Sequence, residues 1–318
     1  MYYQQSINLF RSQFGRSSLF TLFKIVLTAA LIIFLADFMI SRKLYESFSS
    51  ADYRPAGFAF VLMFLNIYLQ YRRWRLACEC LLNEWDRKKI FLSLFHGFPA
   101  GAVTPGRIGE YFARGIELQG NSASRIALSV FIEKLFPLIP VFLIGLLSFT
   151  LFLKIKLLFI FFLFILLSIL LLIFFKILKN LSSSQRVKNG WIKKISGSIE
   201  LFNKMDRSFV IRMIILSVLF YFCYIMQYAL LVSAFSGNLY MLKYMWAGSL
   251  LFFIKAFIPP VTYGDLGIRE GVSVYFITSL GENAAAGLNA SLFLFCFNLL
   301  IPSIAGAILL FSSRRLER

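Results

Sequence analysis

The chain has 318 residues, of which 59% are hydrophobic and 18% aromatic, and its formal net charge is +18. This apolar content exceeds what a soluble core needs, so lipid must cover the excess. In a membrane protein a large positive charge usually marks one leaflet face, and the sequence has no basic soluble segment that would bind nucleic acid. The composition therefore predicts a polytopic membrane protein and excludes a nucleic-acid partner.

Several apolar segments reach about 20 residues, the length that a helix needs to cross a bilayer. A transmembrane barrel would instead alternate with period two, which the sequence does not do. We therefore expect an all-α fold with full transmembrane helices at residues 19–40, 56–77, 126–153, 157–177, 209–234 and 284–311.

Two further apolar stretches, residues 90–120 and 240–280, are interrupted by proline and glycine. Proline removes a backbone donor and glycine permits tight turns, so each stretch predicts a helical hairpin or a pair of half helices. The expected backbone breaks are Pro105, Gly106 and Gly109 in the first stretch, and Pro259, Pro260, Gly264, Gly267 and Gly271 in the second.

The placement of lysine and arginine in loops and at helix ends indicates the orientation. If the full helices alternate across the bilayer, most of these cations fall on one side, including those of residues 72–75, 87–89, 176–207 and 314–318. Loops rich in lysine and arginine stay inside, so both termini are predicted to be cytoplasmic and the protein to lie in the cytoplasmic membrane.

With this orientation the two broken stretches enter from opposite faces and lie about half the chain apart. Interrupted segments at corresponding positions of two halves are typical of an inverted repeat around a transporter site. Two unrelated re-entrant loops are the alternative. We expect one membrane domain, residues 1–318, with halves 1–178 and 208–318. The basic segment 179–207 between them is predicted to be a cytoplasmic interfacial helix.

Charged residues inside the apolar stretches are the candidates for function, because an ion at bilayer depth costs about 2.5 to 3.5 kcal/mol on insertion scales. In TPGRIGEYFARGIELQG, four charges at spacings of three and four would form one stripe on a helix: Arg107, Glu110, Arg114 and Glu117. Glu133 and Lys134 follow in the next helix. Adjacent side chains point about 100° apart, so each needs another partner, and we expect Arg107 or Arg114 to pair with Glu133.

The second broken stretch carries Lys255 and then Asp265, Arg269 and Glu270 in YGDLGIREG. A helix that begins near Gly267 would point its N-terminal amides at an anion. We predict that the two breaks hold an anionic head group at an internal cavity, with Arg107 and Arg269 as ligands and Glu110 and Glu270 as orienting carboxylates. The alternative is that these charges are ion-pair locks between helices. The full predicted binding set is Arg107, Glu110, Arg114, Glu133, Lys134, Lys255, Asp265, Arg269 and Glu270.

Residues for metal or covalent chemistry are sparse. The chain has one histidine, His96, and four cysteines whose spacing suits neither a zinc site nor a disulfide framework. We also find no nucleophile beside a general base. We therefore expect no metal, no cofactor and no enzymatic activity, which leaves an intramembrane lipid-modifying enzyme as the weakest alternative.

The motifs TPGRIGEYFARG, SVFIEKLFPL and GDLGIREG resemble those of the flippase-like membrane family typified by the membrane half of lysyl-phosphatidylglycerol synthases. The resemblance covers nearly the whole chain. Three departures are visible: Lys134 stands where arginine is usual, Pro137 where an acidic residue is common, and Asp265 where glycine is frequent. A lysine binds phosphate as a point charge, so the head-group preference is expected to differ.

The resemblance implies that a polar, phosphate-bearing lipid moves between leaflets while its tails stay in the bilayer. A non-catalytic scaffold for a glycosyltransferase acting on polyprenyl-phosphate lipids is the alternative. Synthase activity is not implied, because the sequence ends at Arg318 directly after its last helix. The expected partners are a membrane lipid with an anionic head group and a separate lipid-modifying enzyme or glycosyltransferase.

Overall fold

The computed structural model describes residues 51–118, 120–154, 201, 204–258 and 267–316, and these residues form helices and no strands. The α-helices are α4 (Tyr53–Ala77), α5 (Arg87–Ala102), α6 (Ile108–Ala113), α7 (Ala123–Phe152), α10 (Arg207–Ser236), α11 (Met241–Phe257), α12 (Ile268–Ser279), α13 (Ala284–Phe295) and α14 (Ile301–Leu316). The predicted helices at 19–40 and 157–177, most of segment 179–207, and residues Pro259, Pro260, Gly264 and Asp265 lie outside the described residues.

Three helical segments in the described part of the chain are long and apolar enough to cross a membrane: Ala123–Phe152, Arg207–Ser236 and Ala284–Leu310. A helix of 30 residues is about 45 Å long, more than the roughly 30 Å of a hydrocarbon core. These segments confirm three of the predicted spans by length and composition. The helix predicted at 56–77 is also present as α4, but Asn66, Gln70 and a run of arginines make it more polar than those three.

Side-chain caps fix where several of these helices begin. A short polar side chain at the N-cap accepts a hydrogen bond from a free backbone amide of the first turn. The caps are Asp52 of α4, Asp86 of α5, Ser122 of α7, Asp206 of α10 and Asn283 of α13. Each lies just before an apolar run, so the local sequence determines these boundaries.

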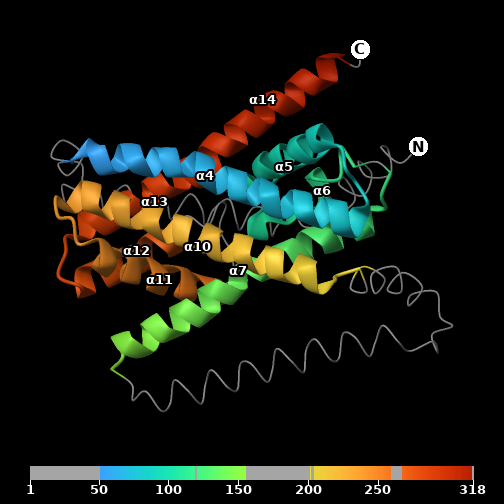
Figure 1. The fold of residues 1–318 in the computed structure, drawn as a ribbon. Helices are drawn as coiled ribbons and strands as arrows, with labels where there is room; N and C mark the ends of the chain where they lie inside the picture. Colours follow the sequence, from blue (N-terminus) through green and yellow to red (C-terminus); the bar gives the residue numbers. More distant parts are fainter. Residues whose placement is uncertain (1–50, 119, 155–200, 202–203, 259–266, 317–318) are drawn as a thin grey trace, which may run out of the picture.

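Helices α4 and α10 run antiparallel along the middle of the bundle (Figure 1). Gln227 Nε2 of α10 donates to the carbonyl of Ala59 at 2.9 Å, and Cys223 Sγ lies 3.6 Å from the carbonyl of Leu62. The buried apolar residues form two main clusters at opposite ends of this pair. One includes Trp74 and Ile90 and the other Tyr228 and Leu250, so each end of the bundle has its own core.

The first predicted hairpin is present as α5 and α6, which pack side by side. They are joined by a 3-10 turn, Pro105–Arg107, where Gly106 (φ 63°) and Arg107 (φ 55°) have left-handed backbones. A Cβ on Gly109 would lie 2.4 Å from the carbonyl oxygen of Ala100, so this glycine permits the close approach. The backbone thus breaks at Gly106, whereas Gly109, the other predicted break, lies inside α6 and serves its packing against α5.

The expected single stripe of four charges on one helix is wrong in part. Helix α6 has only six residues, because the left-handed turn at Gly106 and Arg107 delays its start and the chain turns after Ala113. Arg107 is therefore the N-cap residue, and Glu117 lies beyond the helix, where its carboxylate is 3.4 Å from His96 Nδ1.

The second predicted hairpin is present as α11 and α12, which also pack against each other. Helix α12 begins after Gly267, whose φ of 91° suits glycine alone. The break predicted at Gly271 is wrong, because this residue lies inside α12. Figure 1 shows the α5–α6 hairpin toward one end of the bundle and the α11–α12 hairpin toward the other. The two hairpins thus lie toward opposite ends of the bundle, and their entry from opposite membrane faces as an inverted repeat stays a prediction.

One long C-terminal helix, formed by α13, a π-helical turn (Cys296–Leu300) and α14, contacts both hairpins. On α13, the carbonyl of Gly287 accepts a hydrogen bond from Ser273 of α12 at 2.6 Å. On α14, Gly306 lies so close to α5 that an added Cβ would be 2.1 Å from the carbonyl oxygen of Phe95. This helix therefore packs against both hairpins, through α13 at one and α14 at the other.

This close packing gives a stability prediction. Gly306→Ala should lower the free energy of unfolding by about 1 to 3 kcal/mol, because the methyl group forces α14 away from the α5 backbone. The matched control is Gly57→Ala on α4, where a Cβ would meet nothing within 4 Å. That change should be neutral or stabilise by up to about 1 kcal/mol. Thermal unfolding in detergent measures both, and equal effects would contradict the packing.

A polar clasp closes the end of the second hairpin. Glu282, in the turn between α12 and α13, accepts from Lys243 Nζ at 2.7 Å and from Asn238 Nδ2 at 3.3 Å. Burial raises the pKa of Glu282, but hydrogen bonds from Lys243, Tyr244 and Asn238 outweigh it, so the pKa is lowered. The stability that the carboxylate contributes is therefore present above its unfolded pKa and lost as the pH falls through the folded value.

The clasp predicts a pH dependence. Between pH 7 and about pH 3, the unfolding temperature of the wild type should fall by more than that of Glu282→Gln, which has no proton to gain at this position. The difference corresponds to about 1 kcal/mol or less, since Lys243 is partly exposed. Parallel curves for the two proteins would show that the clasp contributes nothing.

Candidate functional site

Six charged residues meet at the first hairpin, and we call them the first-hairpin cluster. They come from α4, the α5–α6 turn, α6 and α7, and they are Arg73, Arg107, Glu110, Arg114, Glu133 and Lys134. Three cations contact the carboxylate of Glu110: Arg114, Lys134 Nζ at 2.8 Å and Arg107 Nε at 3.2 Å. Arg107 and Arg114, at the two ends of α6, thus share the Glu110 carboxylate with Lys134 of α7.

Glu133 has two arginine partners. Arg73 Nη2 lies 2.7 Å from one carboxylate oxygen and Arg114 Nη1 lies 3.4 Å from the other. Arg114 is one of the two partners predicted from the sequence, and its pairing is confirmed. Arg107, the other predicted partner, contacts Glu110 instead, because its left-handed backbone turns it toward α6. Arg73 was not predicted at all.

Burial differs sharply within this cluster. The side chains of Arg73, Glu110, Arg114 and Glu133 are no more than 5% exposed, whereas Arg107 is 33% and Lys134 29% exposed. Four cations stand against two carboxylates, so the formal charge of the cluster is +2. Two cations therefore extend from a buried carboxylate toward an accessible surface.

Aromatic rings and glycines hold the buried arginines in place. The guanidinium carbon of Arg114 lies 4.6 Å from the centre of the Trp74 ring, and that of Arg73 lies 4.3 Å from the Phe220 ring. On α5, a Cβ at Gly97 would lie 2.9 Å from Arg114 Cγ. The absence of a side chain there makes room for the arginine, a role that the HGFPAGA pattern alone does not reveal.

A second group, which we call the second-hairpin cluster, consists of Arg269, Glu270 and Ser291. Arg269 Nη2 lies 2.6 Å from Glu270 Oε1, and Arg269 Nε donates to Ser291 Oγ on α13 at 3.0 Å. The other oxygen of Glu270 accepts from the backbone amide of Gly267 at 2.7 Å. The predicted contact between Glu270 and Arg269 is thus present. In contrast to the first cluster, its charges balance.

Two further residues of the predicted binding set belong to the second hairpin. Lys255 lies in the last turn of α11 and is half-buried. Asp265 lies outside the described residues. Ser291, by contrast, was missed because it lies in an alanine-rich helix where the sequence showed only apolar packing.

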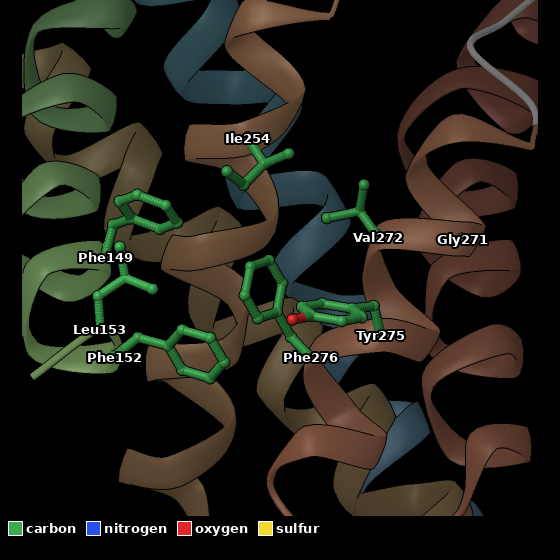
Figure 2. A pocket seen from close by; sticks show the side chains of 8 residues that line it. All are labelled: Phe149, Phe152, Leu153, Ile254, Gly271, Val272, Tyr275 and Phe276. Carbon is green, nitrogen blue, oxygen red and sulfur yellow. The ribbon is translucent and has the colours of Figure 1, made fainter.

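One cavity lined by described residues lies beside the second hairpin. It is an apolar groove of about 350 Å³ between α7, α11 and α12. Figure 2 shows its side chains: Phe149, Phe152, Leu153, Ile254, Gly271, Val272, Tyr275 and Phe276. Gly271 lies on this groove, with open space where a Cβ would be. The groove lies beside the second hairpin and is lined by no charged side chain.

Metal chemistry has no visible site in the described ranges. No group of three or more histidine, cysteine, aspartate or glutamate residues among them could hold a metal ion. The four cysteines, Cys78, Cys80, Cys223 and Cys296, are free thiols.

Membrane-length apolar helices with charged hairpins at opposite ends define an integral, polytopic α-helical membrane protein. Residues 21–306 match the family described as the lysylphosphatidylglycerol synthase TM region, and the chain belongs to this family. No curated protein and no solved structure matches the chain. The family confirms the resemblance drawn from the motifs and indicates a role connected with membrane lipid.

Proposed function

We propose that the protein is a flippase-like transporter that moves a polar, phosphate-bearing lipid between the leaflets of the cytoplasmic membrane. The observation that carries this proposal is the charge of the first-hairpin cluster. Its cations outnumber its carboxylates by two, and Arg107 and Lys134 remain about one-third exposed while anchored on buried Glu110.

An anion is the ligand that this arrangement favours. Unbalanced positive charge inside a membrane protein is costly, and it persists mainly where it is paired or functional. A phosphate would supply the missing negative charge. Arginine binds phosphate oxygens with a planar fork, whereas Lys134 contributes a point charge that can follow the head group.

The family and an apolar groove near the second hairpin support a lipid as the ligand, as opposed to a soluble anion. The family is connected with membrane lipid, and an apolar groove lies beside the second hairpin, where an acyl chain can rest. At that hairpin we propose Arg269 as the head-group ligand and Glu270 as its orienting carboxylate. Each of the two opposed hairpins then binds the head group at one leaflet, while the acyl chains remain in the bilayer. Both termini lie in the cytoplasm in this proposal.

The test is a leaflet-resolved assay with purified protein in liposomes. A phosphatidylglycerol labelled on one acyl chain is added, and the label in the outer leaflet is bleached at timed intervals. Wild-type protein should speed the exchange of label between leaflets. Lys134→Gln should slow it about tenfold, because one accessible cation of the cluster is lost. Arg212→Gln, which changes an exposed arginine of α10, is the control and should be neutral.

The same assay separates the alternatives. Binding of the labelled lipid without exchange would favour a scaffold that presents lipid to a separate lipid-modifying enzyme or glycosyltransferase. Neither binding nor exchange would contradict the proposal. Equal rates for wild type and Lys134→Gln would move the site away from the first hairpin.

A further inference from the structure

A polar stripe runs along the inner face of α4 toward the first-hairpin cluster. Asn66, Gln70 and Arg73 are spaced by four and three residues, so they lie on one face of the helix. Asn66 and Arg73 are buried, and they share this face with buried Ala59 and Met63. The face that carries the polar side chains thus points into the bundle and not toward lipid.

Several donors on this stripe have no hydrogen-bond partner among the residues that the structure describes. Asn66 Oδ1 accepts from Gln70 Nε2 at 3.1 Å, but Asn66 Nδ2 has no acceptor. Arg73 uses Nη2 for Glu133, while its Nε and Nη1 have no acceptor, and neither has Arg114 Nε. A buried donor without a partner is rare and costs about 1 to 3 kcal/mol.

All these unsatisfied atoms are donors, so the group that completes them must be rich in acceptors. Both carboxylates of the cluster are already paired. Seven residues separate Asn66 from Arg73, which is about 10 Å along a helix. A phosphate together with the hydroxyl groups of its substituent spans several ångströms and offers acceptors along its length.

On the basis of the proposed function, we infer that the α4 stripe is a wall of the head-group site that selects hydroxylated phosphate esters. Arg73, with Arg114, binds the phosphate oxygens through its unsatisfied Nε and Nη1 donors, and Asn66 Nδ2 binds a hydroxyl oxygen of the same head group. A quaternary ammonium head group has no acceptor for Asn66 and is therefore disfavoured. Asn66 selects between head groups because a head group without an acceptor leaves the buried Asn66 Nδ2 donor unpaired, which costs binding free energy.

The experiment measures binding to purified protein in detergent by calorimetry. The probes are short-chain phosphatidylglycerol, short-chain phosphatidylcholine and free glycerol 3-phosphate. Wild type should bind phosphatidylglycerol about tenfold more tightly than phosphatidylcholine. Asn66→Leu, which removes the amide at similar volume, should abolish this preference by weakening phosphatidylglycerol alone. Arg73→Lys should weaken both lipids about tenfold, because it keeps the charge and loses the fork.

Controls separate binding from folding. Arg212→Lys, at an exposed position of α10, should bind like wild type, and thermal unfolding of each variant should show a folded protein. If Asn66→Leu fails to fold, Asn66→Ser retains one short donor and should lose part of the preference. If glycerol 3-phosphate binds with the same dependence on Arg73, the site recognises the head group without its acyl chains. If only the lipid binds, recognition also requires the acyl chains.

The inference and the transport proposal can fail separately. A folded Asn66→Leu protein that keeps the full preference for phosphatidylglycerol would overturn the role of the stripe, whatever the transport rate. Phosphatidylglycerol binding with the expected Asn66 and Arg73 dependence, but without exchange between leaflets in wild type, would support the stripe and contradict transport.

Discussion

Glu133→Gln is expected to lower the free energy of unfolding by about 3 to 5 kcal/mol, because it removes the carboxylate that balances two buried arginines. Arg73 would keep its charge with no ion pair among those described here, at 5% exposure of its side chain. Arg114 would retain only Glu110. Thermal or denaturant unfolding of the purified protein in detergent measures this loss.

A double-mutant cycle shows which arginine is the partner. Combining Glu133→Gln with Arg73→Met should recover much of the loss, because the uncompensated charge disappears together with its partner. The matched cycle with Arg107→Met should be close to additive, since Arg107 contacts Glu110 and not Glu133. Strong coupling between Glu133 and Arg107 would contradict the pairing seen in the structure.

The hairpins could be predicted from the sequence because their breaks are local. Glycine and proline determine the backbone where they stand, so the left-handed turn at Gly106 and the start of α12 after Gly267 follow from short stretches of sequence. The pairing of Arg114 with Glu133 could also be predicted from the sequence. Glu133 and the adjacent Lys134 point about 100° apart on α7 and cannot pair with each other, so Glu133 needs a cation from another helix.

The place of Arg73 in the first-hairpin cluster could not be predicted, because an arginine at the end of a transmembrane helix usually indicates only the cytoplasmic side. It lies in a run of arginines, Arg72, Arg73 and Arg75, at the end of the predicted helix 56–77, where arginine indicates the cytoplasmic side. In the structure α4 includes this run and continues as a π-helical turn, so one of the three arginines faces inward. Which one does so depends on the packing of α4 against α7 and α10, and tertiary packing is not visible in a single sequence.

The ion pair of Arg269 with Glu270 was predicted from the sequence, but its geometry departs from the general rule for adjacent residues. Adjacent helical residues point about 100° apart, yet Glu270 is the third residue of α12 and curls back to accept the amide of Gly267. That position brings its other oxygen within 2.6 Å of Arg269. The general rule for adjacent residues therefore fails at a helix start, where a carboxylate also serves as a cap.

Arg269→Lys is expected to reduce lipid exchange about tenfold while the unfolding temperature stays within a few degrees of wild type. Lysine keeps the charge opposite Glu270 but loses the fork and the donor to Ser291. Arg269→Ala should instead lower the free energy of unfolding by about 3 to 5 kcal/mol, because Glu270 is fully buried and would lose its counter-ion. Leaflet exchange and thermal unfolding are measured on the same preparations.

The two substitutions together show whether Arg269 binds the head group or only stabilises the packing of α12 against α13. If Arg269 only locks α12 to α13, then Arg269→Lys will transport like wild type, and Arg269→Ala combined with Glu270→Gln will regain both stability and transport because no buried charge is left unpaired. If Arg269 binds the head group, the double variant will regain stability but not transport. Full transport by a stable Arg269→Ala protein would exclude both roles and leave the first-hairpin cluster as the site of head-group binding.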